Sequence, residues 1–413
     1  MKIVLILTST CVGLFGLTLS ESIDLAINNS PKVSISKSNI KYNQYIKDEA
    51  TSAYYPTLDA GFAWQELEND TSFAVNPNHN FNLSLKYNIF NGFSDSSTIK
   101  SKESEIESSK LQDDAVIADL KLAVTVGYTD YLKAKKLIKS QEEQFASLTK
   151  QYENTKVRYE EGIVAKNDLL LIDVEKLKAE QELIKAKSNL IVAKSNLENI
   201  IAIEIPANDK IDDFDASVKE LKDIGYLYEQ MMNNRSEIKA MKFKSKSILY
   251  QRDAITGNYL PKVNLEVSHQ VNGREKISGT SVIQPKDQTA YGVNVTWNLY
   301  SGGRDLAMRK ALLEKDSQQN FQLHQLKLDL KKQLRQVYEG FKVAKSAKNV
   351  AARAKESAKE NYRITSDRYS YGDVDTLTLL VSQSNLTQAI NAHNDAYYNL
   401  YVAYKALQRV VGS

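Results

Sequence analysis

The segment FNLSLKYNIFNG, residues 81–92, decides the fold because it joins two patterns that belong to different elements. Its apolar and polar residues alternate with a period of two, as in a strand, where successive side chains point to opposite faces. The alternation stops at Asn91-Gly92, a turn signal, and no proline follows until Pro206. The segment therefore predicts a strand with one apolar face that leads into a very long helical stretch.

The same pattern returns 210 residues later as YGVNVTWNLYSG, residues 291–302. Other landmarks recur in the same order, about 205 residues apart early in each half and 210 later in it. They are Asn-Ser-Pro at 29–31 with Asn-Arg-Ser at 234–236, Tyr-Pro at 55–56 with Leu-Pro at 260–261, and Arg-Tyr-x-x-Gly at 158–162 and 368–372. Such an ordered set predicts an internally duplicated fold.

Each half carries two alternating segments, which gives four predicted strands. In the second of these four segments, the alternating apolar residues continue to Ile89. The strands approach the ~9–11 residues that cross a bilayer at a tilt. Their aromatic apolar faces and their opposite faces of Asn, Lys and Glu favour a membrane barrel with a wet lumen. The alternative is a half-buried sheet of a soluble domain. The residues predicted to face lipid are Phe62, Trp64, Phe81, Leu83, Leu85, Tyr87, Val263, Leu265, Tyr291, Val293, Val295 and Trp297.

Four strands cannot close a barrel, and lipid does not tolerate open sheet edges. Several copies of the chain must therefore share one barrel. Three copies would supply twelve strands, in agreement with the even-numbered closed barrels of outer membranes.

The long helices carry apolar residues at spacings of three and four, from Ile117 to Tyr159 and from Leu330 to Tyr369, which marks a coiled-coil seam. A helix over residues 94–159 would be about 100 Å long, far longer than a globular domain uses internally. Small or polar residues such as Gly127 interrupt the seam. They favour a helical tube lined by water, and a solid coiled-coil bundle is the alternative.

Acidic and basic residues are mixed along the 413 residues and leave a formal charge of +3, so no basic patch predicts a nucleic-acid partner. The four histidines are scattered and have no metal-ligand spacing. No glycine-rich phosphate loop precedes a lysine, and no nucleophile has a positioned base. The sequence therefore predicts no enzyme activity, no metal and no cofactor.

The N-terminus has the features of a secretory signal over residues 1–18, because Lys2 precedes an apolar run that is too short to span a membrane. A short buried helix is the alternative. Cleavage is expected between Gly13 and Ser20. The single cysteine, Cys11, lacks the context of a lipid acceptor, so the mature chain is expected to be free of cysteine.

Taken in order, these motifs resemble those of the TolC-type outer membrane factors, the outer membrane efflux protein family. The resemblance runs from LSESIDLA at 19–26 through the Phe-Asn-Gly and Tyr-Ser-Gly-Gly turns to both Arg-Tyr-x-x-Gly turns. It implies a mainly α protein with a membrane β-barrel portion. The implied assembly is a trimeric twelve-stranded β-barrel, four strands per protomer, continuous with a long α-helical barrel.

The resemblance implies a passive channel-tunnel in the outer membrane of a Gram-negative bacterium, extending into the periplasm, for multidrug efflux or type I secretion. The implied partners are two further copies in a homotrimer, a periplasmic adaptor (membrane fusion) protein, an inner-membrane pump and outer-membrane lipid. Residues 19–208 would form the first repeat, 209–235 an equatorial segment and 236–413 the second repeat. A periplasmic coiled-coil adaptor or scaffold without a pore is the alternative.

In this family, two helix–turn–helix tips meet the adaptor. A glycine at such a turn supplies a positive φ where the helix must end, and a helix cap without a partner role is the alternative. The residues assigned to docking by the resemblance are Arg158, Tyr159, Gly162, Ile163, Arg368, Tyr369 and Gly372.

The resemblance also implies an entrance gate in which Tyr369 hydrogen-bonds Asp168 across the closed end. The family's acidic constriction corresponds to Thr378 and Val381 in this chain, so its ring is not expected at those positions. The acidic residues proposed to substitute for it lie on the neighbouring turn and are Asp373 and Asp375.

Overall fold

The computed structural model describes residues 17–66, 68, 78–206, 211–273 and 286–412. The expected signal segment up to residue 16, with Cys11, and most of the two strand connectors lie outside the described residues. Contacts divide the chain into two units, which are described separately. Unit 1 comprises residues 1–36, 113–236 and 327–413, and unit 2 comprises residues 37–112 and 237–326.

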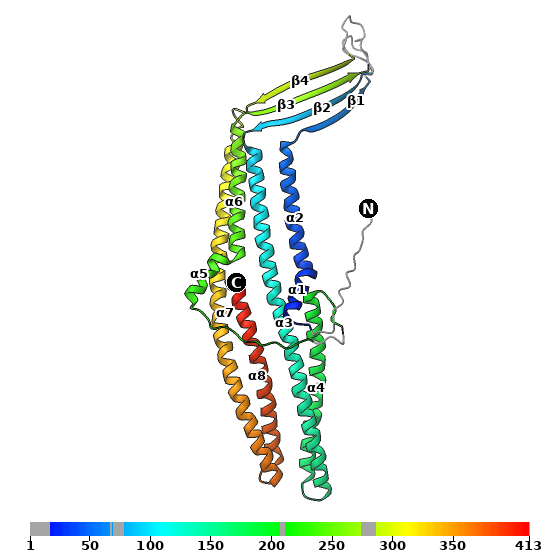
Figure 1. The fold of residues 1–413 in the computed structure, drawn as a ribbon, viewed down its shortest axis with the longest axis vertical. Helices are drawn as coiled ribbons and strands as arrows, with labels where there is room; N and C mark the ends of the chain where they lie inside the picture. The colour runs from blue at the N-terminus through cyan, green and yellow to red at the C-terminus, as the bar shows by residue number, and fades with distance from the viewer. Residues whose placement is uncertain (1–16, 67, 69–77, 207–210, 274–285, 413) are drawn as a thin grey trace. The chain divides into compact units, whose positions relative to one another are not determined.

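The elements of the two halves follow one another in the same order (Figure 1). The first half contains α1 (Leu19–Asn29), α2 (Pro31–Thr51), the 3-10 turn η1 (Ser52–Tyr54), β1 (Thr57–Gln65), β2 (Asn78–Asn91), α3 (Ser94–Glu160) and α4 (Lys166–Ile201). The second contains α5 (Ile224–Asn234), α6 (Ser236–Thr256), η2 (Gly257–Tyr259), β3 (Lys262–Asn272), β4 (Asp287–Thr296), α7 (Arg304–Tyr371) and α8 (Thr376–Val411). Counterpart helices begin 205 residues apart before the strands and 210 apart after them, so the duplicated sequence folds as a duplicated structure.

Local chemistry places the ends of the helices. Thr18 caps α1 in a reciprocal capping box with Glu21. Pro31 is the first residue of α2, where its missing N–H costs nothing. Asp223 accepts a hydrogen bond from the Gly225 N–H at 2.7 Å at the start of α5.

In unit 2, the four strands form one antiparallel sheet in the order β1-β2-β3-β4. Directly opposed residues of neighbouring strands lie on the same face. Leu58 is opposite Leu85, which is opposite Val267, which in turn is opposite Tyr291. The register therefore gathers the apolar residues of the four strands on one face, which His79, His269, Asp287 and Thr289 interrupt near the end of the sheet away from the helices.

Two details of the strands differ from the sequence expectation. A β-bulge shifts the register between Asn88 and Phe90, so that Phe90 is opposite Val263 and continues the apolar face instead of Ile89. Trp297, predicted as a strand residue, lies just beyond the end of β4, and its indole N–H donates to the carbonyl oxygen of Tyr259 at 3.1 Å.

The turn between β2 and α3 packs backbone against backbone on the end of α6. A Cβ atom on Gly257 would lie 2.5 Å from the Gly92 carbonyl oxygen, so neither chain segment has room for a side chain. Further along, the Ser101 and Ser247 hydroxyls lie 2.9 Å apart, and they join α3 to α6. Unit 2 is thus held together by close contacts between small residues.

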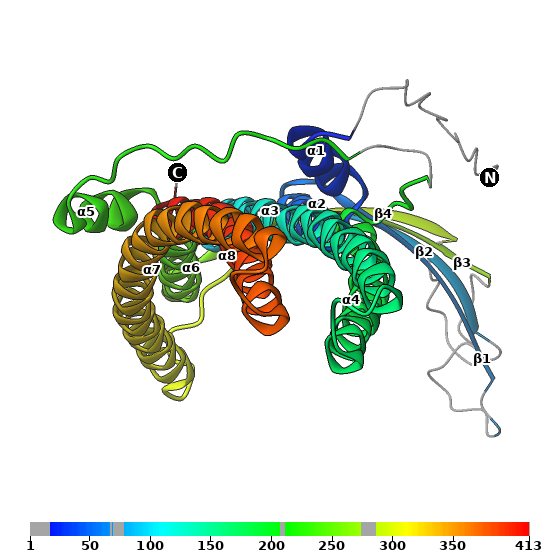
Figure 2. The ribbon, with the colours of Figure 1, turned by 90° about the horizontal axis from the view of Figure 1, so that it is seen from below.

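In unit 1, the hairpin of α7 and α8 lies beside the hairpin of α3 and α4, and α1, α5 and residues 211–223 lie on one side of this row (Figure 2). The main buried cluster joins α1, the start of α2, α3, α4 and α8. Its residues are Ala26, Val33, Leu120, Val124, Tyr128, Leu132, Leu197, Ile201, Ile205, Ile211 and Tyr398. A smaller cluster nearer the tips contains Leu148, Ile172, Ala179 and Leu380.

Candidate functional site

The two helical tips share one backbone geometry. At the first, the Gly162 N–H donates to the Tyr159 oxygen at 2.9 Å and the Ile163 N–H to the Arg158 oxygen at 2.8 Å. At the second, the Gly372 and Asp373 N–H groups donate to the counterpart oxygens at 3.1 and 3.0 Å. The φ angles of Gly162 and Gly372 are 76° and 82°, which is the left-handed region that favours glycine.

The structure brings Arg158 and Tyr369 of the two tips together. The Arg158 guanidinium lies over the Tyr369 ring, 5.8 Å from its centroid, a cation–π geometry. The Tyr369 hydroxyl lies 3.5 Å from the Thr376 hydroxyl. Among the described residues, Tyr369 thus has Thr376 as its hydrogen-bond partner rather than Asp168, which lies in the first turn of α4.

The acidic residues of the second tip have different roles. Asp375 caps α8 and accepts the Thr378 N–H at 2.8 Å. Hydrogen bonds from the hydroxyl and the N–H of Thr378 lower the pKa of Asp375. Asp373 is exposed in the turn, and Val381 is exposed one turn beyond Thr378. Of the two carboxylates proposed for the gate, only Asp373 is therefore not engaged in a helix cap.

Sequence reasoning missed a set of tyrosines that holds residues 211–216 against α3 and α8. The Tyr128 hydroxyl lies 2.8 Å from the Leu17 carbonyl oxygen and 2.6 Å from that of Asp212. Burial, reinforced by the charge of Asp212, raises the pKa of Tyr128, so its hydroxyl stays protonated and can donate. Phe214 packs against Tyr401, with their ring centroids 4.7 Å apart.

Asp213 completes this set of contacts, and we call residues 211–216 the strap. Its carboxylate accepts from the Tyr398 hydroxyl at 2.7 Å and pairs with the Lys136 ammonium at 2.7 Å, so it links α8 to α3. Burial raises the pKa of Asp213, but its bonds to Lys136 and Tyr398 lower it by more, and the net pKa is lowered. The only sequence signal was the run of tyrosines at 397, 398, 401 and 404 on one side of α8.

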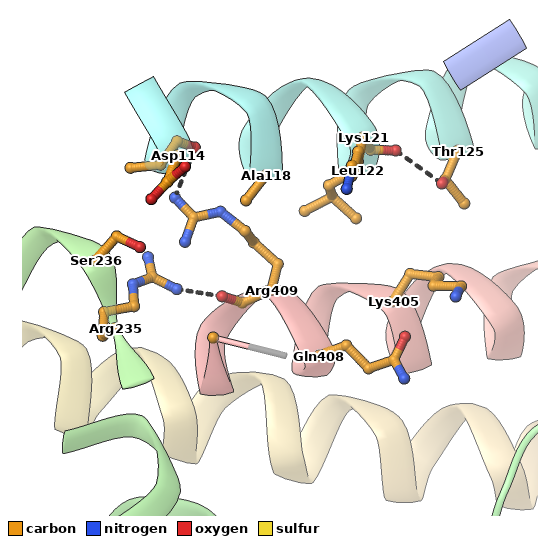
Figure 3. A pocket seen from close by; sticks show the side chains of 12 residues that line it. Asp114, Ala118, Lys121, Leu122, Thr125, Arg235, Ser236, Lys405, Gln408 and Arg409 are labelled. Atoms are coloured by element: carbon orange, nitrogen blue, oxygen red, sulfur yellow. Dashed lines mark hydrogen bonds between the residues drawn. The ribbon is translucent and has the colours of Figure 1, made fainter. Parts of the chain in front are cut away.

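A cavity of about 290 Å³ opens between α3, Ser236 and the end of α8 (Figure 3). Arg409 donates to the Asp119 carboxylate at 2.6 Å and to the Ala115 carbonyl oxygen at 3.3 Å. Arg235 donates to the carbonyl oxygen of Arg409. The Arg235 guanidinium thus satisfies one of the last carbonyls of α8, and the Arg409 side chain joins the end of α8 to α3.

Among the residues that the structure describes, no helix combines the length and apolarity of a membrane span. Within the same ranges, no group of three His, Cys, Asp or Glu side chains could hold a metal ion.

Solved structures with this architecture include proteins described as outer-membrane proteins or channels. CusC superposes with a TM-score of 0.82 at 13% identity, over 96% of this chain and 92% of CusC. The CmeC outer membrane channel of Campylobacter jejuni superposes with a TM-score of 0.79 at 16% identity, over 95% of this chain and 85% of CmeC. The outer membrane protein VceC of Vibrio cholerae superposes with a TM-score of 0.76 at 16% identity, over 96% of each chain. No curated protein sequence matches the chain.

Two matched helical hairpins and a sheet with one apolar face thus define the class of outer-membrane channel proteins. The sequence profile of the outer membrane efflux proteins matches residues 22–202 and 227–413, and the chain belongs to this family. The chain is therefore an efflux channel protein of the outer membrane. The predicted family and outer-membrane location are confirmed, and so is a mainly α fold with a sheet portion; the trimer and the closed barrel stay predictions, and the adaptor or scaffold alternative is set aside.

Proposed function

We propose that the chain is one protomer of the passive exit duct of a tripartite efflux or type I secretion system and catalyses no reaction. Three copies contribute four strands each to a twelve-stranded barrel in the outer membrane, which continues as a helical tube through the periplasm. A periplasmic adaptor binds the tips, and an inner-membrane pump supplies energy and selects the cargo.

The observation that carries this proposal is the sheet, with its single apolar face and its two outer strands. Every residue of β1 and β4 is exposed in the single chain, including Phe62 at 70% and Tyr291 at 79%. Apolar surface is favoured in lipid by about 25 cal/mol per Å². Lipid can cover the apolar face, but it cannot satisfy unpaired backbone groups at the edges, so neighbouring copies are required there.

The tips support docking of an adaptor because both present apolar side chains to solvent. Ile163 is 60% exposed and Tyr371 is 84% exposed, and exposed apolar surface of this kind marks interaction sites. The docking set defined above, with Arg158 already stacked on Tyr369, would form the contact. The Tyr369–Asp168 link is retained as a contact of the closed trimer.

Native mass spectrometry of the mature protein, released from detergent micelles, tests the proposal. A trimer that requires detergent supports it, and single-channel conductance in a planar bilayer should follow. A monomer or dimer that stays soluble without detergent overturns it.

Ion selectivity tests the gate. Asp373→Lys should shift the current toward anions if this carboxylate lies at the constriction, whereas Asp375→Lys should mainly weaken the cap of α8. Unchanged selectivity in both variants would remove these residues from the gate.

A further inference from the structure

The strap shows which peptide chemistry a helix face of this protein binds. Residues 211–216 read Ile-Asp-Asp-Phe-Asp-Ala and contact lysines and tyrosines of α3 and α8. The Asp213 carboxylate pairs with the Lys136 ammonium at 2.7 Å. Phe214 packs among three tyrosine rings, and that of Tyr401 is nearest, with 4.7 Å between the centroids. An acidic peptide with one aromatic side chain is thus matched by basic and aromatic residues of the helices.

The sequence repeat places a corresponding face on α7, where it is open to solvent. The repeat offset of 210 residues relates Tyr128 of α3 to Tyr338 of α7 and Leu132 to Lys342 (132 + 210 = 342). Leu132 belongs to the main buried cluster and is 1% exposed, whereas Lys342 is exposed. The face that α3 turns toward the strap is therefore charged and uncovered on α7.

Positive charge is concentrated on this face of α7. Five residues at spacings of four and three share one side of the helix, and four of them are exposed cations. Over residues 330–355, α7 carries eight basic residues and one acidic residue, whereas the matching residues 120–145 of α3 carry five and three. The five residues, which we call the basic stripe, are Lys331, Arg335, Tyr338, Lys342 and Lys345.

The charge of the basic stripe is poorly balanced within the chain. Lys342 pairs with Glu339 at 3.6 Å, but both side chains are more than half exposed, and such a pair contributes little to stability. Among the residues that the structure describes, Arg335 and Lys345 form no ion pair. A cluster of like charges raises the local potential and attracts a partner of the opposite sign.

An apolar cavity adjoins the first two residues of the basic stripe. It has a volume of about 540 Å³ and lies between α5 and α7, where Ile224, Tyr228 and Leu328 line it together with Lys331 and Arg335. The Lys331 ammonium lies over the Tyr228 ring, 5.8 Å from its centroid. Cations of this kind also attract the ring face of a bound aromatic side chain, so the cavity can hold such a side chain beside positive charge.

We propose that the basic stripe and this cavity form a docking surface for an acidic peptide segment of a partner protein. Carboxylates of the segment pair with the stripe, and an aromatic side chain enters the cavity between α5 and α7. The occupant is inferred from charge complementarity and from the strap, which has this chemistry on the corresponding face of α3. The surface is separate from the tips, so the docked segment adds to the exit-duct proposal and does not depend on it.

A peptide with the sequence of the strap is the probe for this surface. The capped peptide IDDFDAS, residues 211–217, carries three carboxylates and one phenylalanine and is labelled with a neutral dye. Fluorescence anisotropy with the detergent-solubilised protein should show saturable binding at low salt, with a Kd below about 1 mM. Binding should weaken in 1 M salt, where the Debye length falls to about 3 Å.

Two double variants with the same change in charge locate the binding site. Lys342→Glu with Lys345→Glu should weaken binding by about tenfold or more, because attraction becomes repulsion at two positions. Lys178→Glu with Lys185→Glu on α4 is the matched control, since both lysines are exposed and lie outside the basic stripe. The control variant should keep the affinity of the wild type within about twofold.

Each contrary outcome identifies a different error. Absence of binding below about 1 mM, or an equal loss of affinity in both double variants, overturns the docking surface. Equal binding of the peptide in which alanine replaces phenylalanine would show a general anion surface and overturn the role of the cavity. If Lys342→Glu with Lys345→Glu instead removes a trimer that native mass spectrometry finds for the wild type, this face packs on a second copy. The docking surface then fails while the exit-duct proposal stands.

Discussion

Replacing Gly257 by alanine should destabilise the protein through one backbone contact. The added Cβ would lie 2.5 Å from the Gly92 carbonyl oxygen, and ordinary contact begins at 3.4 Å, so the segments must separate by 0.9 Å (3.4 − 2.5). Both neighbours, the Gly92 oxygen and the Ser94 nitrogen at 3.1 Å, are backbone atoms and cannot rotate away. Forced shifts of this kind cost about 1–3 kcal/mol. Alanine regains about 0.4–1 kcal/mol by restricting the unfolded chain, because the φ angle of Gly257 is not left-handed.

The expected net loss is about 1–2 kcal/mol, which lowers the Tm by a few degrees. Thermal unfolding in detergent, followed by far-UV circular dichroism, measures it. Gly340→Ala is the matched control, because this glycine lies within α7 with nothing within 4 Å of an added Cβ. That variant should gain about 1 kcal/mol from helix propensity. A Tm for Gly257→Ala at or above that of the wild type would refute the close contact.

Three further outcomes follow from the strap and the turns. Tyr398→Phe removes a hydrogen bond to Asp213 and should cost about 1–2 kcal/mol in chemical unfolding, whereas Tyr401→Phe should be near neutral, since no hydrogen bond of that hydroxyl occurs among the described residues. Burial raises the pKa of Asp213, but its bonds to Lys136 and Tyr398 lower it by more, so the pKa of Asp213 in the folded protein is depressed. The stability that the Asp213 carboxylate contributes is therefore present above its pKa in the unfolded chain, about 3.9, and is lost as pH falls through its pKa in the folded protein. Asp213→Asn should therefore flatten the loss of Tm below about pH 4. An unchanged dependence of Tm on pH in this range would contradict the prediction. Gly302→Ala strains a left-handed residue by about 1–2 kcal/mol. Thermal unfolding followed by circular dichroism should show this cost as a Tm lower by a few degrees, and an unchanged Tm would count against the strain.

The sequence predicted those features that depend on period and order. Alternation placed Leu85 and Val267 on one face, the absence of proline predicted α3 and α7, and the repeated glycines predicted both tip turns. Each of these signals is local, so no knowledge of distant contacts was needed.

Features that depend on a partner could not be predicted in this way. Ile89 and Phe90 are both apolar, so the pattern could not locate the bulge between them. The strap depends on Asp213 meeting Tyr398 across 185 positions of sequence. The cap at Asp375 could have been predicted, because an Asp directly before a helical run is a recognisable N-cap signal, but the sequence analysis assigned this residue to the gate.

The matched lengths of the counterpart helices impose a joint constraint on insertions and deletions. α4 and α8 each have 36 residues, and α3 and α7 have 67 and 68. Seven residues added to α3 alone would lengthen it by about 10.5 Å and leave α4 unable to return to the same level. A duct engineered for a deeper periplasm would therefore need equal insertions in all four helices, and natural length changes should likewise occur in sets of four.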